Sequence, residues 1–125
     1  MKFGKKVSVE LIGDAKESYE RLNKIVGEQK ASGKTSSDEI TLWSGIQRVF
    51  DLLVDNPFYG DNAKKKKIPD YYIKKYDVQN LYIADLPLFW RMVYVIKGNK
   101  VEIVCIVLDI FDHDDYNKIF GIRKR

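Results

Sequence analysis

The spacing of apolar residues changes along this sequence from a helical period to a strand period, and this change restricts the possible folds most. Apolar side chains recur every three to four residues through 14–29 and again through 36–55, which predicts two amphipathic helices joined by a short polar loop. Residues 5–12, which precede them, alternate apolar and polar side chains as a half-buried strand does. This order of elements predicts a chain in which helices and a sheet are segregated.

Three β-rich runs make up most of the second half of the chain, over residues 80–86, 89–97 and 100–109. The dipeptide Gly98-Asn99 suits a tight hairpin turn, so we expect an antiparallel meander. Residues 101–108 are almost continuously apolar, which is typical of a central strand covered on both faces. The predicted fold is therefore α+β, with an N-terminal strand, a helical hairpin and a three- to four-stranded antiparallel sheet that carries the helices on one face.

Three shorter segments have patterns that fit more than one structure. Residues 68–76 suit either a short helix or an extended connector, and residues 112–118 suit a polar turn or one helical turn. Residues 119–122 are expected to form a last short extended piece.

Length and cysteine content exclude several classes of protein. A chain of 125 residues suits one domain over 1–125, with enough surface buried to fold without staples. Its single cysteine, Cys105, cannot pair within the chain, which excludes a disulfide scaffold and a cysteine-rich zinc site. No run approaches the roughly 18 apolar residues that span a membrane. We therefore expect a cytoplasmic protein with no membrane partner.

Positive charge is concentrated in the middle of the chain. The formal net charge is +4, with no excess over residues 1–59, +5 over 60–100 and −1 over 101–125. A basic field of this kind is typical of a protein with a phosphate-rich or acidic partner, although a solvated lysine-rich loop fits the same pattern. The lysines that make most of it are Lys64, Lys65, Lys66, Lys67, Lys74 and Lys75.

The only histidine of the chain, His113, follows the predicted central strand in an acidic segment. A lone histidine in a polar turn is more often solvated or structural than functional. However, segments that leave a central strand are favoured places for site residues, because a rigid sheet positions them. The sequence has no glycine-rich phosphate loop, no pair of metal ligands at a typical spacing and no nucleophile elbow.

Arg91 is the second candidate, because it shares a strand face with the apolar side chains of Phe89 and Val93. A planar guanidinium in such a place suits bidentate contact with a phosphate. The structural alternative is an ion pair with a neighbouring acid, either Asp85 or Asp109.

Several short motifs occur in an order that resembles the RelE/ParE toxin superfamily of type II toxin–antitoxin systems. The resemblance runs from the first strand to about residue 121 and is best over 50–121. The motifs are Asn56-Pro57-Phe58-Tyr59-Gly60, Ile68-Pro69, Leu86-Pro87, Trp90-Arg91-Met92-Val93-Tyr94, and His113 with Tyr116 three positions later.

This resemblance implies a small toxin that is neutralised by a cognate antitoxin protein and acts, like RelE, as a ribosome-dependent mRNA endonuclease. It implies metal-independent chemistry without a cofactor, in which the ribose 2′-OH attacks the adjacent phosphorus. Arg91 would stabilise the phosphate, and His113 and Tyr116 would transfer protons or stack on a base. The six lysines would hold the RNA backbone by charge.

Two other functions fit the same sequence. A ParE-like toxin would bind a DNA topoisomerase without cutting RNA. A non-catalytic relative would use the basic groove only to bind a partner or nucleic acid, with an affinity that falls steeply with salt.

Overall fold

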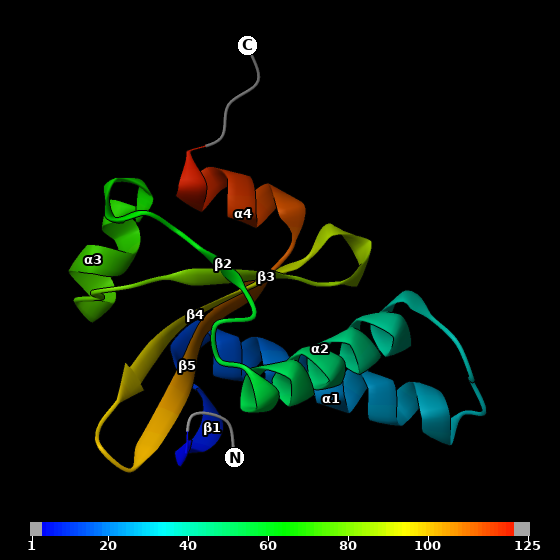
Figure 1. The fold of residues 1–125 in the computed structure, drawn as a ribbon. Coiled ribbons are helices and arrows are strands. Elements are labelled where there is room, and N and C mark those ends of the chain that lie inside the picture. Colours follow the sequence, from blue (N-terminus) through cyan, green and yellow to red (C-terminus); the bar gives the residue numbers. More distant parts are fainter. Residues whose placement is uncertain (1–3, 122–125) are drawn as a thin grey trace.

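The computed structural model describes residues 4–121, which form a sheet with helices on both sides (Figure 1). The elements follow the predicted order of strand, two helices and sheet, and a C-terminal helix that the sequence does not predict at this length comes last. They are β1 (Lys6–Leu11), α1 (Gly13–Ala31), α2 (Asp38–Asp55), β2 (Asp61–Asn62), the 3-10 turn η2 (Lys65–Lys67), α3 (Asp70–Tyr76), β3 (Tyr82–Asp85), the 3-10 turn η3 (Pro87–Phe89), β4 (Arg91–Gly98), β5 (Glu102–Phe111) and α4 (His113–Phe120).

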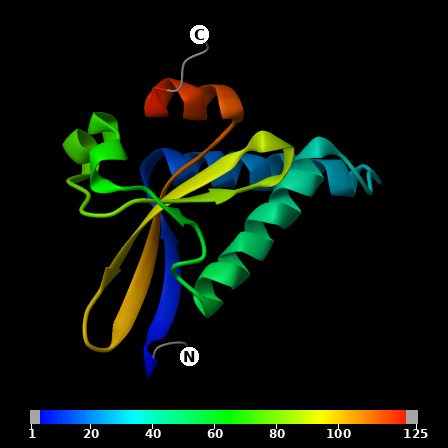
Figure 2. The same cartoon turned by 45° about the horizontal axis from the view of Figure 1, so that its top comes forward.

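The sheet has five strands in the order β1-β5-β4-β3-β2 (Figure 2). The predicted meander is confirmed, because β3, β4 and β5 pair antiparallel in sequence order. The first strand pairs in parallel with β5, from Lys6 opposite Glu102 to Leu11 opposite Val107. β5 therefore has a neighbour on each side and is an internal strand, as its apolar run predicts.

Helices cover both faces of the sheet, whereas the sequence analysis placed them on one. The reason lies in β4, where Met92 and Tyr94 point to one face and Val93 and Val95 to the other, and all four are buried. α1 and α2 pack on the first face, and α3 and α4 pack on the second. An apolar second face needs a cover of its own, and these two short helices provide it.

The predicted helical hairpin is formed by α1 and α2. The ring of Tyr19 on α1 packs on α2, with its centroid 4.7 Å from that of Trp43 and 5.7 Å from that of Phe50. The second helix begins at a side-chain cap, in which Ser37 Oγ accepts a hydrogen bond of 3.0 Å from the backbone N–H of Ile40.

The segments with ambiguous patterns are mostly helical. Residues 70–76 form α3, and residues 113–120 form α4, which is longer than the single turn considered for 112–118. The expected extended piece over 119–122 is wrong for Ile119 and Phe120, which belong to α4, and Ile122 lies outside the described residues. No helix in residues 4–121 is long and apolar enough to cross a membrane.

Candidate functional site

Arg91 opens β4 and lies between an acid and an aromatic ring. Its Nε is 3.1 Å from Oδ1 of Asp85, the residue opposite it on β3. Its guanidinium carbon is 5.3 Å from the centre of the Tyr116 ring, within the range of a cation–π contact. The ion pair with Asp85 is therefore the one that forms, whereas the side chain of Asp109 bonds to Tyr72.

This ion pair lies where a phosphate could replace the carboxylate. The side chain of Arg91 is 20% exposed and that of Asp85 is 78% exposed. A surface ion pair of this kind contributes about 1 kcal/mol or less, so an anion that offers two oxygens can compete with it. The guanidinium itself stays in place, because its Nη1 donates a 3.1 Å hydrogen bond to the carbonyl of Trp90.

Tyr116 belongs to an aromatic cluster that connects Arg91 with α4. Its ring stacks on Phe120 at 4.5 Å between centroids and meets the edge of Phe111 at 6.2 Å. Burial raises the pKa of the Tyr116 phenol, and nearby Asp85 adds to this effect while Arg91 opposes it. The phenol is therefore protonated at neutral pH and available as a hydrogen-bond donor.

His113 is exposed on the first turn of α4, on the same side of the helix as Tyr116. Its Nε2 is 3.1 Å from the side-chain nitrogen of Asn117, and its ring centroid is 6.3 Å from that of Phe89. The structure therefore brings Arg91 and Tyr116 into contact, while the contacts of His113 go to Asn117 and Phe89.

The turn that presents Phe89 is a part of the site that the sequence analysis missed. Leu88 and Phe89 both have left-handed backbone conformations, with φ of 63° and 61°, which is uncommon for residues other than glycine. Phe89 is 74% exposed although it is aromatic. Backbone strain of this kind is concentrated at functional sites. Leu88 and Phe89 follow Pro87, which indicates a turn, but no sequence pattern indicates two successive left-handed residues.

Three of the four lysines in the lysine run line a groove beside Tyr116. The groove has a volume of about 960 Å³ and lies between η2, α3 and α4. Basic and aromatic side chains share its walls, which include those of Lys64, Lys66, Lys67, Tyr71, Tyr116 and Phe120. Lysines beside aromatic rings are the combination that binds single-stranded nucleic acid, by charge on the backbone and by stacking on the bases.

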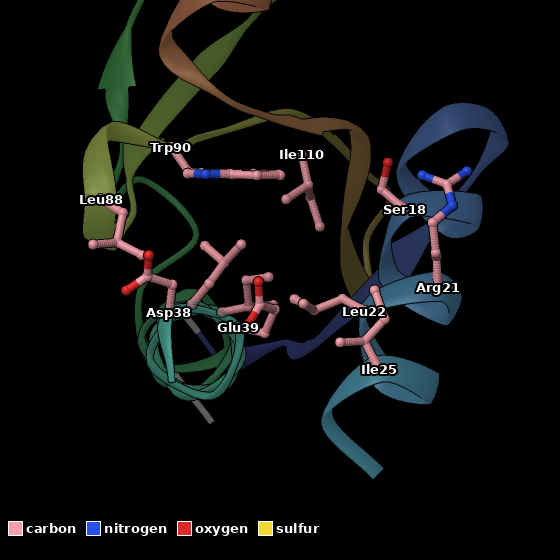
Figure 3. A pocket seen from close by; sticks show the side chains of 11 residues that line it. Ser18, Arg21, Leu22, Ile25, Asp38, Glu39, Leu88, Trp90 and Ile110 are labelled. Atoms are coloured by element: carbon pink, nitrogen blue, oxygen red, sulfur yellow. The ribbon is translucent and has the colours of Figure 1, made fainter. Parts of the chain in front are cut away.

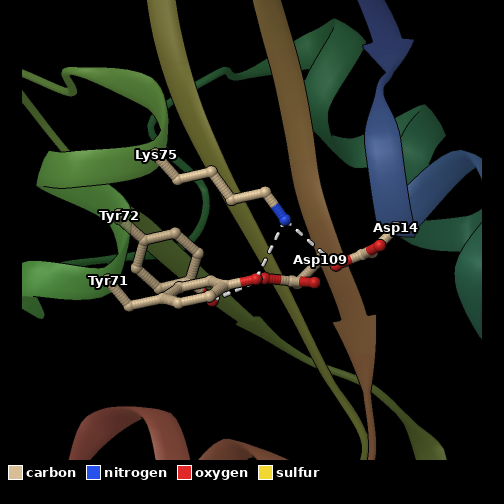
Figure 4. A network of polar contacts seen from close by, with 5 residues as sticks. All are labelled: Asp14, Tyr71, Tyr72, Lys75 and Asp109. Carbon is tan, nitrogen blue, oxygen red and sulfur yellow. Dashed lines mark hydrogen bonds and ion pairs between the residues drawn. The ribbon is translucent and has the colours of Figure 1, made fainter.

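Lys74 and Lys75 lie apart from that groove, against a separate cavity of about 470 Å³. The Nζ of Lys75 is 3.1 Å from the hydroxyl of Tyr71 and 3.2 Å from Oδ2 of Asp14 (Figure 4). These two contacts raise the pKa of the Lys75 ammonium. The six lysines grouped by the sequence analysis are therefore divided between two surfaces.

A buried carboxylate lies next to this network. Asp109 is 6% exposed, and its Oδ2 accepts a 2.8 Å hydrogen bond from the hydroxyl of Tyr72 (Figure 4). Burial raises the pKa of this carboxyl to about 6, and the hydrogen bond from Tyr72 opposes the shift. The sequence pattern gave no sign of this pair, because Asp109 ends an apolar run and Tyr72 is far from it in sequence.

A second cavity, of about 470 Å³, lies between α1, α2 and the η3 turn (Figure 3). Its inner wall is apolar, with Leu22, Trp90 and Ile110, and polar side chains such as that of Arg21 lie at its rim. Successive residues of a strand point to opposite faces, so Trp90 and this cavity lie across the sheet from Arg91. It is not part of the site around Tyr116.

The arrangement can bind a phosphate through Arg91 and donate a proton or hydrogen bond through Tyr116. Within residues 4–121, no group of three or more His, Cys, Asp or Glu side chains is placed to hold a metal ion. No protein-family model matches the sequence, and neither a curated protein nor a solved structure is significantly similar to it.

Proposed function

We propose that this chain is a RelE-like toxin of a toxin–antitoxin pair and cleaves mRNA on the ribosome in the cytoplasm, with a cognate antitoxin as its inhibitor. The observation that carries the proposal is the contact between Arg91 and Tyr116, a phosphate-binding group and a protonated phenol, at the wall of a lysine-lined groove. The resemblance of the sequence motifs supports the same reading.

The proposed reaction needs a cation and two groups that handle protons. The 2′-oxygen of one nucleotide forms a bond to the adjacent phosphorus while the bond from phosphorus to the 5′-oxygen breaks. The phosphate would replace the carboxylate of Asp85 as the partner of Arg91. Arg91 would then stabilise the negative charge that increases on the phosphate in the transition state. The leaving 5′-oxygen would take a proton from the site.

Tyr116 and His113 are the groups that would handle these protons. The Tyr116 phenol is already next to Arg91 and, with its raised pKa, holds a proton to donate. Imidazole can accept a proton or donate one, so His113 would act on the 2′-OH or on the leaving oxygen. For this role, RNA has to lie across the first turn of α4 between the two side chains.

The groove beside Tyr116 would guide the RNA strand towards the site. Lys64, Lys66 and Lys67 would contact successive phosphates, and the aromatic wall would stack on bases. Lys65 precedes Lys66 on the exposed η2 turn and would add charge without lining the groove. Lys74 and Lys75 line a separate cavity, so they would act only at longer range. The ammonium of Lys75 is in addition engaged with Asp14 and with the hydroxyl of Tyr71.

The experiment that tests the proposal is cleavage of an mRNA on translating ribosomes by the purified protein, read by primer extension. Arg91→Ala is expected to lower the cleavage rate by about 100-fold or more, the usual effect of removing one group that stabilises developing charge. Arg48→Ala is the matched control, because this arginine is exposed on α2, which packs on the opposite face of the sheet. Equal cleavage by both variants, or intact mRNA with the wild-type protein, would refute the proposal.

A non-catalytic binding protein is the second candidate, and the contacts of His113 favour it. The imidazole contacts Asn117 and Phe89 rather than Arg91, so the catalytic groups are not assembled in the free protein. This candidate predicts RNA affinity that falls steeply with salt, with no cleaved product at any salt concentration. Growth arrest with DNA damage that survives Arg91→Ala would instead favour a ParE-like topoisomerase target.

A further inference from the structure

β1 is an edge strand of the sheet with one side open. Among the described strands it pairs with β5 alone, along its whole length from Lys6 to Leu11 (Figure 2). The backbone N–H of Lys6 donates to the carbonyl of Val101, and that of Ile12 donates to the carbonyl of Val107. Since alternate residues of a strand direct their backbone groups to opposite sides, the even-numbered residues bond to β5.

The outward backbone groups therefore belong to the odd-numbered residues, chiefly Val7 and Val9. Within residues 4–121 no hydrogen bond is made to these outward N–H and C=O groups. The side chain of Val9 is only partly buried and packs at the border of the core. An unpaired edge with apolar side chains is a template for a further strand.

We propose that β1 pairs with β1 of a second copy of this chain, antiparallel and centred on Ser8, so that two sheets join into one. The positions of the outward groups restrict the register, because only odd-numbered residues of both copies can exchange hydrogen bonds. Centring on Ser8 places Val7 opposite Val9 of the second copy, and the two valines of each chain then make four backbone hydrogen bonds across the junction.

Charge complementarity selects this register among those the backbone allows. It places Lys6 opposite Glu10 of the second copy, and the two-fold symmetry makes this contact twice. In the neighbouring allowed registers, centred on Val7 or on Val9, Lys6 lies opposite Ser8 or Ile12 of the second copy. Neither register forms an ion pair. Lysines on an edge usually repel other strands. Here each lysine meets an acid, so the edge is complementary to itself.

A cysteine at the two-fold axis tests the register directly. The two Ser8 residues form a pair without backbone hydrogen bonds, with Cα atoms about 4.5 Å apart, which a disulfide can bridge. The Ser8→Cys variant is expected to form a disulfide-linked dimer under mild oxidation. The native Cys105 is buried and does not compete. Lys6→Cys is the matched control, because its two copies would lie about 13 Å apart and stay reduced.

Charge reversal tests the same contact without a covalent bond, by analytical ultracentrifugation. Lys6→Glu alone is expected to weaken the dimer about 10-fold, and Lys6→Glu with Glu10→Lys is expected to restore it. A wild-type protein that remains monomeric at about 10⁻⁴ M would overturn the proposal. Equal crosslinking of the two cysteine variants would also overturn it, because it would mean that the disulfides form by random collision. A third contrary result would be protection of the β1 edge from hydrogen exchange in a monomer, which would mean that the chain itself covers this edge.

Discussion

Asp109 gives the most quantitative prediction for this fold, because it is a buried carboxyl with a neutral isostere. Its pKa is raised to about 6 from 3.8, chiefly by burial, with Asp14 and Asp115 adding to the shift and Lys75 opposing it. Replacement by asparagine keeps an oxygen that accepts the hydrogen bond from Tyr72 and removes the charge. We therefore expect Asp109→Asn to stabilise the protein at neutral pH.

The sign and size of the effect follow from linkage. A carboxyl whose pKa is higher in the folded state binds a proton on folding, so its contribution to stability is complete below pH 3.8 and is lost as the pH rises through 6. A shift of about two pKa units corresponds to at most about 3 kcal/mol. The stability of the Asp109→Asn variant relative to wild type should therefore increase from pH 4 to pH 7 by up to this amount.

The measurement is urea unfolding of both proteins at a series of pH values. Equal slopes of the unfolding free energy against urea concentration would establish that both proteins expose the same surface on unfolding. Asp51→Asn, which changes an exposed aspartate of α2, is the control and should show no such trend. The reasoning would be refuted if the stability difference between Asp109→Asn and wild type were the same at pH 4 and pH 7. It would also fail if the variant were less stable than wild type at neutral pH.

Two further substitutions test how the fold holds the site. A methyl group on Gly45 would overlap the Pro87 ring, so Gly45→Ala should destabilise the protein by about 1–3 kcal/mol and displace the η3 turn, which the NMR shifts of Phe89 would report. Tyr94→Phe should lower the free energy of unfolding in urea by about 1–3 kcal/mol. The lost hydroxyl donates a 2.8 Å hydrogen bond to the carbonyl of Pro57 and accepts one of 2.9 Å from the N–H of Gly60. The exposed Tyr59→Phe is its control, and equal losses from the two tyrosines would contradict this account.

The sequence predicts the local elements well because their patterns are strong and local. The helical period predicts α1 and α2, and the hairpin turn and β-rich runs predict β4 and β5. The pairing of β1 with β5 could not be predicted, because two apolar strands far apart in sequence fit many partners. The sequence does not predict the full length of α4, because its apolar residues, Tyr116, Ile119 and Phe120, recur at helical spacing over too few turns to outweigh an extended structure.

Within the candidate site, the sequence predicts only the contact between residues that lie opposite each other on neighbouring strands. Arg91 and Asp85 flank the turn before β4, so their pairing was among the alternatives considered. The contact of Arg91 with Tyr116 depends on how α4 packs across the sheet, which only the folded chain defines. The sequence indicates Asp109 only as a possible partner of Arg91, because the preceding apolar run does not reveal the hydroxyl of Tyr72.

The pairing of the first strand with the last strand affects how the chain can fold during synthesis. β1 is synthesised before the other four strands, yet β5, its neighbour within the described sheet, is synthesised after all of them. The β3–β4–β5 meander is local, so it can form as soon as it emerges, whereas the β1–β5 pair has to close the whole segment from α1 to β4 as a loop. A nascent chain thus carries β1 unpaired until β5 has been made, and stalling before β5 would leave β1 without its partner in the sheet.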